Sequence, residues 1–375
     1  MITRRQYLKQ ATLATCGLAL AHALPAEPTT EIEGKHSLKA HAHKRGLLAG
    51  CAVSAANLHE EAFTKVLAEQ YSLVVPENCM KFGFVHPAAD RYDFADGDAL
   101  VAFAEQHKIK VRGHNFVWHE ALPAWFAGTV TKDNAKKFLT EHILTVGGRY
   151  KGKMQSWDVV NEALNDDGTL RKSPWLNIIG EDYIAKAFQF AHEADPAAEL
   201  YYNDYSLENE AKRKGAVELV KKLKAQGITV TAVGLQGHDK LDWPTAKQQA
   251  DTIEAFAALG VKVCITELDV DVLPRNAPGT SADISATSSG GAGLNPYTAG
   301  LPDAVQQELA RRYAELFDIF VKYRASISRV TFWGVTDAGS WLNNFPIRGR
   351  TNYPMLFDRE GKPKAAFFAV MKTAK

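Results

Sequence analysis

The chain has 375 residues, of which 46% are hydrophobic and 23% charged, so it can bury a large core and is not a disordered protein. This length suits one large α/β barrel or two ordinary domains. Its 44 basic and 43 acidic residues leave a formal net charge of +1, so no global field favours nucleic acid or an anionic membrane surface, and a neutral ligand fits best.

Residues 1–26 have the organisation of an export signal. A basic start at Arg4 and Arg5 precedes a short apolar run and a small-residue exit. The apolar run is shorter than the about 20 residues that span a bilayer, and "TRRQYLK" resembles the twin-arginine signature of bacterial export. We expect cleavage after Ala23 or Ala26, and a mature protein in the periplasm or outside the cell that does not contact the membrane. An uncleaved basic amphipathic helix is the alternative interpretation.

Three cysteines remain after removal of the signal: Cys51, Cys79 and Cys264. Their number is odd, no C-x-x-C spacing occurs, and all three lie in apolar runs, which argues against a zinc site. We interpret them as buried free thiols that act as small hydrophobic side chains. Pairing of Cys51 with Cys79 stays open if the first two strands are neighbours.

Residues 27–45 are polar without a clear period and are interpreted as a linker or an ordered N-terminal tail that leads into the domain. From residue 46 to 375, β-type runs alternate with amphipathic helical runs. Strands are expected at 47–54, 72–77, 110–118, 154–162, 199–205, 231–238, 262–270 and 329–335, and helices at 58–70, 97–107, 132–148, 181–194, 207–226, 245–258, 303–323 and 363–373. Eight such units predict an α/β fold with a single (β/α)8 TIM barrel.

A doubly wound open sheet is the alternative fold. However, no Gly-rich dinucleotide fingerprint follows any strand, and polar residues gather at the strand C-termini, where a barrel builds its site. One segment breaks the rhythm: residues 275–300, rich in Gly, Ser, Ala and Pro, separate the seventh strand from its helix. Because only Tyr297 offers an aromatic contact there, a tolerated loop insertion is favoured over a lid.

Polar and aromatic residues follow nearly every expected strand. They are Glu77, Asn78, Lys81, His114, Trp118, His119, Asn161, Glu162, Asn203, Tyr205, Gln236, His238, Glu267, Asp269 and Trp333, with Trp341 on the loop beyond. Any one of them could be a core residue, but together they indicate a carbohydrate cleft, because hydroxyls need hydrogen-bonding partners and sugar faces need flat apolar surfaces. A metal hydrolase would also gather such residues. Since no H-x-H or H-E-x-x-H spacing occurs, we expect neither a metal nor another cofactor.

Two apolar runs end on carboxylates, Glu162 in "WDVVNEAL" and Glu267 in "ITELDV". Cleavage of a glycosidic bond needs two carboxyl groups in different protonation states. Strands four and seven lie across a barrel, and their C-terminal ends converge on its mouth. A separation of about 5–5.5 Å between the two carboxyl groups would give a reaction that retains the anomeric configuration. A separation of about 6.5–9.5 Å would leave room for a water molecule and give inversion. His238 can hold Glu267 ionised, while the nearby negative charge keeps a proton on Glu162.

Seven segments in order resemble the motif set of glycoside hydrolase family ten: "PENCMKF", "GHNFVWHEALPAWF", "WDVVNEAL", "YYNDYS", "GLQGH", "ITELDV" and "FWGVTDAGSWL". The members of this family are mostly endo-β-1,4-xylanases, and the resemblance covers about residues 46–370. It implies an eightfold barrel that cleaves internal bonds of xylan or xylo-oligosaccharides with retention. We expect a monomer without a nucleic-acid partner.

The resemblance also implies roles for the strand-end residues. Glu162 becomes the general acid/base and Glu267 the nucleophile. Asn161, Gln236, His238 and Asp269 become their supports. Sugar binding on the non-reducing side falls to Glu77, Asn78, Lys81, His114 and Trp118 under a roof of Trp333 and Trp341, and on the other side to Asn203 and Tyr205.

Two other functions remain open on the same barrel. One is hydrolysis of β-1,4-glucan or mixed-linkage glucan, and the other is sugar binding without catalysis. Xylose lacks the hydroxymethyl group of glucose, so a roof of Trp333 and Trp341 would disfavour glucan by steric clash. Such discrimination is worth about 1–3 kcal/mol per group, which gives preference and not absolute exclusion.

Overall fold

The computed structural model describes residues 32–275, 282–284, 287–288 and 290–373. The expected signal segment, residues 1–26, lies outside the described residues. The barrel belongs to the compact unit Glu33–Lys375. Within the described ranges, no helix combines the length and the apolar character that crossing a bilayer requires.

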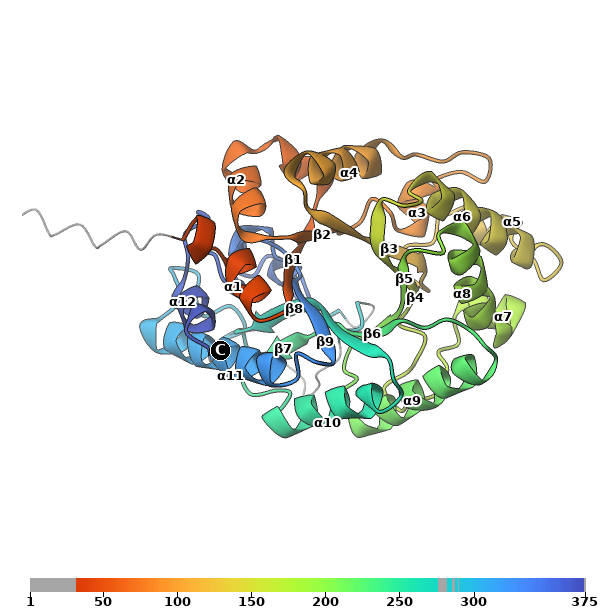
Figure 1. Ribbon diagram of the computed structural model, residues 1–375. Coiled ribbons are helices and arrows are strands. Elements are labelled where there is room, and N and C mark those ends of the chain that lie inside the picture. Colours follow the sequence, from red (N-terminus) through yellow and green to blue (C-terminus); the bar gives the residue numbers. More distant parts are fainter. Residues whose placement is uncertain (1–31, 276–281, 285–286, 289, 374–375) are drawn as a thin grey trace, which may run out of the picture. The chain divides into compact units, whose positions relative to one another are not determined.

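Eight parallel strands close into a barrel, seen along its axis in Figure 1. They are β1 (Leu48–Val53), β2 (Leu73–Pro76), β3 (Lys110–Val117), β4 (Met154–Asn161), β5 (Glu199–Asp204), β6 (Ala232–Leu235), β8 (Lys262–Asp271) and β9 (Ile327–Phe332). Each strand pairs with the next, pairing of β6 with β8 and of β9 with β1 completes the ring, and β7 (His238–Lys240) pairs with the end of β8. The prediction of a single (β/α)8 barrel is therefore confirmed.

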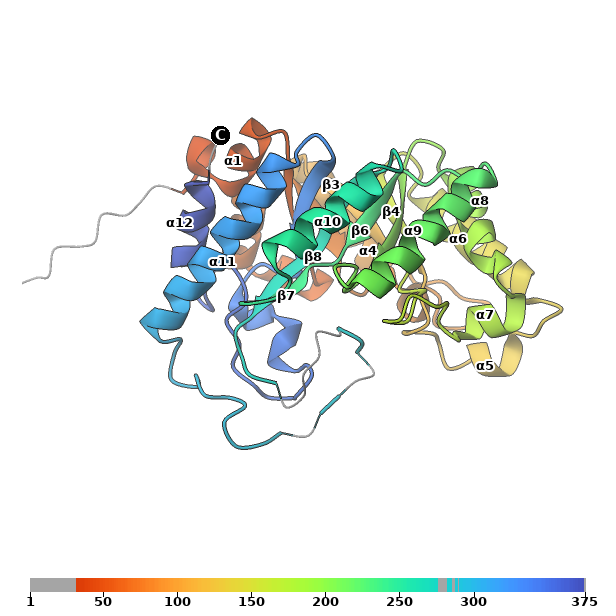
Figure 2. The same cartoon turned by 90° about the horizontal axis from the view of Figure 1, so that it is seen from below.

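Helices surround the barrel on its outside (Figure 1), and Figure 2 shows the same ring from below. The longer ones are α2 (Glu61–Gln70), α4 (Ala95–His107), α6 (Ala135–Arg149), α8 (Asp182–Ala194), α9 (Glu210–Ala225), α10 (Ala246–Ala257), α11 (Asp303–Lys322) and α12 (Ala365–Met371). Shorter elements are α1 (Leu38–Lys44), α3 (Phe82–Val85), α5 (Phe126–Thr129), α7 (Pro174–Ile179) and the 3₁₀ turns Gly34–His36, Ala55–His59, Asp337–Gly339 and Trp341–Asn343. Each expected helix is found within three residues of its expected limits.

The strands are covered on both faces, which explains their nearly continuous apolar sequences. β2 and β6 are buried along their whole length. Where a strand contacts a bulky neighbour, glycine makes room: Gly113 on β3 lies against the indole of Trp157 on β4, and a Cβ at Gly113 would come within 2.0 Å of that ring. Trp157 itself is completely buried.

The segment before β1 is ordered, as in one of the two interpretations of the sequence. Helix α1 begins after Ser37, whose side chain accepts a hydrogen bond from the Ala40 amide. Leu38 is completely buried, and its amide donates to Oε1 of Gln70 at 2.9 Å. The ordered unit therefore begins before residue 46. Most other polar residues of this segment are exposed, although Ser37 and His41 are buried, so the few apolar positions that dock the helix do not stand out in the sequence.

The described cysteines are free thiols. Cys51 and Cys264 are buried, and Cys79 is half-buried. Burial raises the pKa of the Cys51 thiol well above its ordinary value and that of Cys79 to about 12. The interpretation as buried free thiols is confirmed for Cys51 and Cys264, whereas Cys79 is a free thiol that is only half-buried, and no disulfide joins Cys51 to Cys79.

Packing at Gly113 predicts a stability effect. Gly113→Ala should lower the free energy of unfolding by about 1–3 kcal/mol, because the added methyl group forces Trp157 out of a filled site. Urea titration of the two proteins measures the difference. The matched control is Gly148→Ala on the exposed face of α6, where a Cβ meets no atom within 4 Å, so a gain of up to about 1 kcal/mol is expected. Equal stabilities of the two variants would contradict this reading of the β3–β4 contact.

Candidate active site

A cavity opens at the C-terminal ends of the strands. It is lined by Glu77, Lys81, His114, Trp118, Asn161, Glu162, Gln236, His238, Glu267, Trp333 and Trp341, together with Ala282 and Ile284. All but the last two were singled out in the sequence as strand-end residues. The loop between β8 and α11 thus contributes to the cavity, whereas the sequence favoured a tolerated insertion there over a lid.

Glu162 is the first residue after β4, and its backbone has φ = 56°. A left-handed conformation is uncommon for a residue other than glycine. Three donors hold the carboxylate: Trp118 Nε1 lies 2.8 Å from Oε2, and Gln236 Nε2 and Asn161 Nδ2 lie 2.9 Å and 3.1 Å from Oε1. Trp118 was expected to bind sugar, and the structure shows that it also fixes this acid.

Burial raises the pKa of Glu162 to about 7, from an ordinary value of 4.5. The negative charge of Asp204 adds to this effect, and the charge of Glu267 adds less. The hydrogen bonds from Gln236 and Trp118 act in the opposite direction. The sequence interpretation assigned the raised pKa to the nearby charge, whereas removal from water is the larger cause. Near neutral pH a large fraction of Glu162 carries a proton.

Glu267 lies near the end of β8 in the opposite electrostatic state. Burial alone would raise its pKa, but the hydrogen bond from His238 and the positive charges of His114, His238 and Arg112 outweigh burial and lower the pKa to about 2. Oε2 lies 3.3 Å from His238 Nε2, and Oε1 accepts from Asn203 Nδ2 at 2.7 Å. Glu267 is therefore an ionised carboxylate over the whole physiological range.

His238 is held by a second carboxylate. Its Nδ1 lies 3.1 Å from Asp269 Oδ1, and Trp341 Nε1 donates to the other oxygen of Asp269 at 2.7 Å. Burial would lower the pKa of His238. The negative charges of Asp269 and Glu267, and the hydrogen bonds that both carboxylates make with the ring, outweigh burial and raise this pKa to about 10. The imidazolium thus bridges two carboxylates, and the support expected from His238 and Asp269 is present in the geometry.

A chain of amides joins the two acids. Asn203 Nδ2 donates to Asn161 Oδ1 at 2.8 Å as well as to Glu267, and Asn203 Oδ1 accepts from Thr266 Oγ1 at 2.6 Å. Asn203 is completely buried. Its expected role in binding sugar is therefore wrong, because both ends of its amide are used inside the protein. It orients Glu267 instead.

Tyr205 was also expected to line the cleft, but only 1% of it is exposed. Its hydroxyl accepts from Arg171 Nη2 at 2.6 Å, and Lys212 Nζ lies 3.3 Å from the ring centroid. These cations cover the ring, so a sugar cannot stack on it in this conformation. Asn78 does not line the cavity either, although its Oδ1 accepts from Lys81 Nζ at 2.9 Å and so orients a lysine that does.

Several functional residues escaped the sequence reading. Asp158 Oδ2 lies 2.8 Å from His114 Nδ1 and so orients that ring, and Arg112 lies 3.6 Å from the other oxygen. Both sit inside apolar strands, and a charged residue in such a run was the signal available. Arg171, by contrast, comes from a polar loop and has no comparable signal.

One trio of potential metal ligands occurs in the described part of the chain: His114, Asp158 and Glu267 offer atoms within 4.8 Å of one another. The trio has other partners, because His114 Nδ1 bonds Asp158 and the Arg112 guanidinium lies beside the same carboxylate. A cation already present at this position disfavours a second one. The geometry therefore fits a hydrogen-bonded support for Glu267 rather than a metal centre.

Residues 37–373 match the sequence profile described as glycosyl hydrolase family 10. The chain is 46% identical to endo-1,4-beta-xylanase A of Xylanibacter ruminicola over 319 residues, covering 84% of this chain and 86% of that protein. It is 43% identical to the beta-1,4-xylanase of Dictyoglomus thermophilum, with coverage of 86% and 87%. Among solved structures, a GH10 endoxylanase from a sugarcane soil metagenome superposes with a TM-score of 0.87 at 43% identity and covers 89% of this chain and 99% of its own.

The raised pKa of Glu162 predicts a pH-dependent stability. In the folded state the carboxyl group keeps its proton up to about pH 7, whereas in the unfolded chain it loses the proton near pH 4.5. The stabilisation is thus complete below pH 4.5 and is lost as the pH rises through 7. The free energy of unfolding should fall relative to that of Glu162→Gln by about 2–3 kcal/mol between pH 5 and pH 8. If urea titrations gave the same pH dependence of the free energy of unfolding for both proteins, this prediction would be ruled out.

Proposed function

Because the chain belongs to glycosyl hydrolase family 10, it is an endo-β-1,4-xylanase that retains the anomeric configuration, and we propose that Glu162 and Glu267 carry the reaction as acid/base and nucleophile. The observation that supports these roles best is the difference between their pKa values, about 7 against about 2, in one cavity. A double displacement needs this pair of states: one protonated carboxyl group and one charged carboxylate.

In the first step, Glu267 attacks the anomeric carbon of the sugar in the cavity. Its carboxylate is free of a proton, and Asn203 and His238 hold it from two sides. Glu162 gives its proton to the leaving oxygen as the bond breaks, so that the departing chain leaves as a neutral alcohol. The step forms a glycosyl–enzyme ester on Glu267 and leaves Glu162 ionised.

In the second step, Glu162 acts as the base. The ester has consumed the negative charge of Glu267, and that charge was one of the causes that raised the pKa of Glu162. With the charge gone, the ionised form of Glu162 is favoured, and it accepts a proton from the water that attacks the ester. The two inversions at the anomeric carbon give net retention, and both carboxyl groups return to their starting states.

The other cavity residues bind and position the sugar. Asn161 donates one N–H to Glu162, and its second N–H can reach the sugar 2-hydroxyl, a contact that strengthens as an oxocarbenium-like centre develops. Glu77, Lys81 and His114 supply further polar contacts from the cavity wall. Lys81 also lies over the Trp118 ring at 4.9 Å from its centroid, which fixes both side chains.

A rigid roof supports xylan as the substrate in preference to glucan. Trp333 is 8% exposed and packs on Ala52 and Val75, with Trp341 against this cluster. The Trp341 indole donates to Asp269 at 2.7 Å. Neither ring can move aside without losing these contacts, so the hydroxymethyl group of a glucose unit would meet a fixed surface.

Replacement of each acid should give a distinct chemical result. Glu267→Ala should abolish hydrolysis of every xylan substrate, because no nucleophile remains. Glu162→Ala should slow cleavage of natural xylo-oligosaccharides by about 10²–10⁴-fold, the usual contribution of general acid–base catalysis. An aryl β-xylobioside with a good leaving group should still react in the first step, and added azide should then yield the β-glycosyl azide. Product NMR identifies the anomer.

The matched control for these variants is Glu193→Ala, an exposed acid on α8, which should retain wild-type rates. Azide rescue of Glu267→Ala should instead yield the α-azide, since azide then replaces the nucleophile. A β-azide from Glu267→Ala, or an α-configured first product of the wild type, would reverse the assignment of roles.

We propose that the enzyme is exported by the twin-arginine route and acts as a monomer in the periplasm or outside the cell. The segment "TRRQYLK" at the start of the chain supports export. The two acids and the side chains that hydrogen-bond them form a complete site without a residue from a second copy, which is compatible with a monomer. Export suits the substrate, because a polymer such as xylan does not enter a cell.

Replacing both Arg4 and Arg5 by lysine should leave the protein in the cytoplasm, since the export machinery reads the arginine pair and not only its charge. Cell fractionation followed by immunoblotting measures the distribution. Lys9→Arg alters a basic residue outside the pair and should be exported normally. Unchanged export of the double lysine variant would show that the protein uses another route or none.

A further inference from the structure

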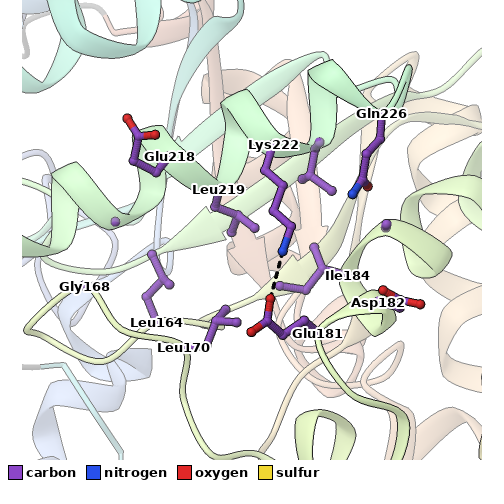
Figure 3. Close-up of a pocket in the computed structure, with 13 residues that line it drawn as sticks. Leu164, Gly168, Leu170, Glu181, Asp182, Ile184, Glu218, Leu219, Lys222 and Gln226 are labelled. Carbon is purple, nitrogen blue, oxygen red and sulfur yellow. Dashed lines mark hydrogen bonds and ion pairs between the residues drawn. The ribbon is translucent and has the colours of Figure 1, made fainter.

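Figure 3 shows a groove between α8 and α9, whose lining shares no residue with the active-site cavity. Aliphatic side chains such as Leu164, Ile184 and Leu219 line it together with charged ones, among them the Glu181–Lys222 ion pair at 2.8 Å. None of the residues that line it is aromatic. The groove therefore lacks the flat aromatic faces that stack against sugar rings.

The described residues of the β8–α11 loop are attached to the segment that follows β9. The Ser288 amide donates to the carbonyl of Pro346 at 2.9 Å. Further along, the Thr351 amide donates to Asn295 Oδ1 at 2.8 Å, and the Tyr353 hydroxyl donates to the carbonyl of Tyr297, also at 2.8 Å. In Figure 2 this connection lies on the same side of the barrel as α5 and α7. These contacts anchor one side of the loop.

The other side of the loop reaches the segment after β4. Asp283 Oδ2 lies 2.8 Å from Arg171 Nη1, and the two side chains are only 19% and 14% exposed. Arg171 also donates through Nε to the backbone carbonyl of Glu162 at 3.2 Å and through Nη2 to Tyr205. We call Arg171 and Asp283 the clasp. Since β4 and β8 lie on different sides of the barrel, the clasp joins two walls of the cleft.

The clasp lies on the side where the leaving chain departs. The sugar attacked by Glu267 occupies the cavity that Glu77, Lys81 and Trp333 line. Arg171 does not line that cavity but is bonded to the backbone of Glu162, which donates the proton to the leaving oxygen, and Ala282 and Ile284 on either side of Asp283 lie at the cavity edge. A chain that extends past Glu162 from the cavity therefore meets Arg171 and Asp283.

We propose that the clasp is a specificity-determining element that restricts the leaving-group side of the cleft to slender, unbranched xylan segments. This inference rests on the proposed function of the cavity. An ion pair across the cleft leaves no room above it for a backbone that carries arabinose or glucuronate branches, whereas a short unbranched chain needs less height. Arg171 of the clasp also holds the Tyr205 hydroxyl and, with Lys212, covers the Tyr205 ring.

Asp283→Asn tests the clasp because it keeps the shape of the side chain and removes its charge. The ratio of kcat/KM on branched glucuronoarabinoxylan to kcat/KM on an aryl β-xylobioside should rise about three- to tenfold, since the aryl group is too small to meet the clasp. Asp283→Lys should raise the ratio further, because two cations repel. The matched control is Asp242→Asn, which changes the net charge equally at an exposed position and should leave the ratio unchanged.

A second measurement does not depend on activity. Exchange of the amide hydrogens of residues 282–284 should accelerate in Asp283→Asn and Asp283→Lys but not in Asp242→Asn. If the Asp283 variants showed unchanged amide exchange, or a ratio of kcat/KM equal to that of the wild type, the proposed role of the clasp would be overturned. If the wild type hydrolyses neither xylan nor the aryl xylobioside, the proposed function fails instead, and the exchange rates still decide whether the clasp exists.

Discussion

The structure depends on keeping two buried carboxyl groups in opposite protonation states in one cavity. Glu162 is 6% exposed and Glu267 is 4% exposed, so solvent stabilises neither charge. The protein resolves the conflict by asymmetry. Glu267 lies against the His238 imidazolium, whereas Glu162 receives only neutral donors, from Trp118, Gln236 and Asn161. The same depth of burial therefore produces an ionised nucleophile and a protonated acid.

Strand register makes this asymmetry possible. Asn161 on β4 lies beside Asn203 on β5, which in turn lies beside Gly234 on β6. A Cβ at Gly234 would lie 2.2 Å from Asn203 Oδ1, so glycine is needed for the amide to reach Glu267. The network thus rests on three adjacent strands of the barrel, whose pairing positions each amide before any substrate arrives.

Much of this could be predicted from the sequence, because strand periodicity and polar residues at strand ends are local patterns. All eight strands and the residues Glu162 and Glu267 follow from such patterns. The burial of Asn203 and Tyr205 could not be predicted, since it depends on Thr266 and Arg171, which lie on other elements. The same applies to the raised pKa of Glu162, whose main cause is the packing around it, and to helix α1, whose few apolar contacts lie within a polar segment.

The connection from Trp341 through Asp269 and His238 to Glu267 has a consequence for evolution. The side chain that shapes the sugar pocket is bonded to the support of the nucleophile. Mutations that would widen the pocket at this point also disturb the reactive carboxylate, so a new substrate cannot be gained there without a loss of rate. New specificities are more accessible in the β8–α11 loop, whose residues Ala282 and Ile284 line the cavity without taking part in this chain of bonds. Lineages of such enzymes should therefore diversify through that loop while the tryptophan roof stays constant.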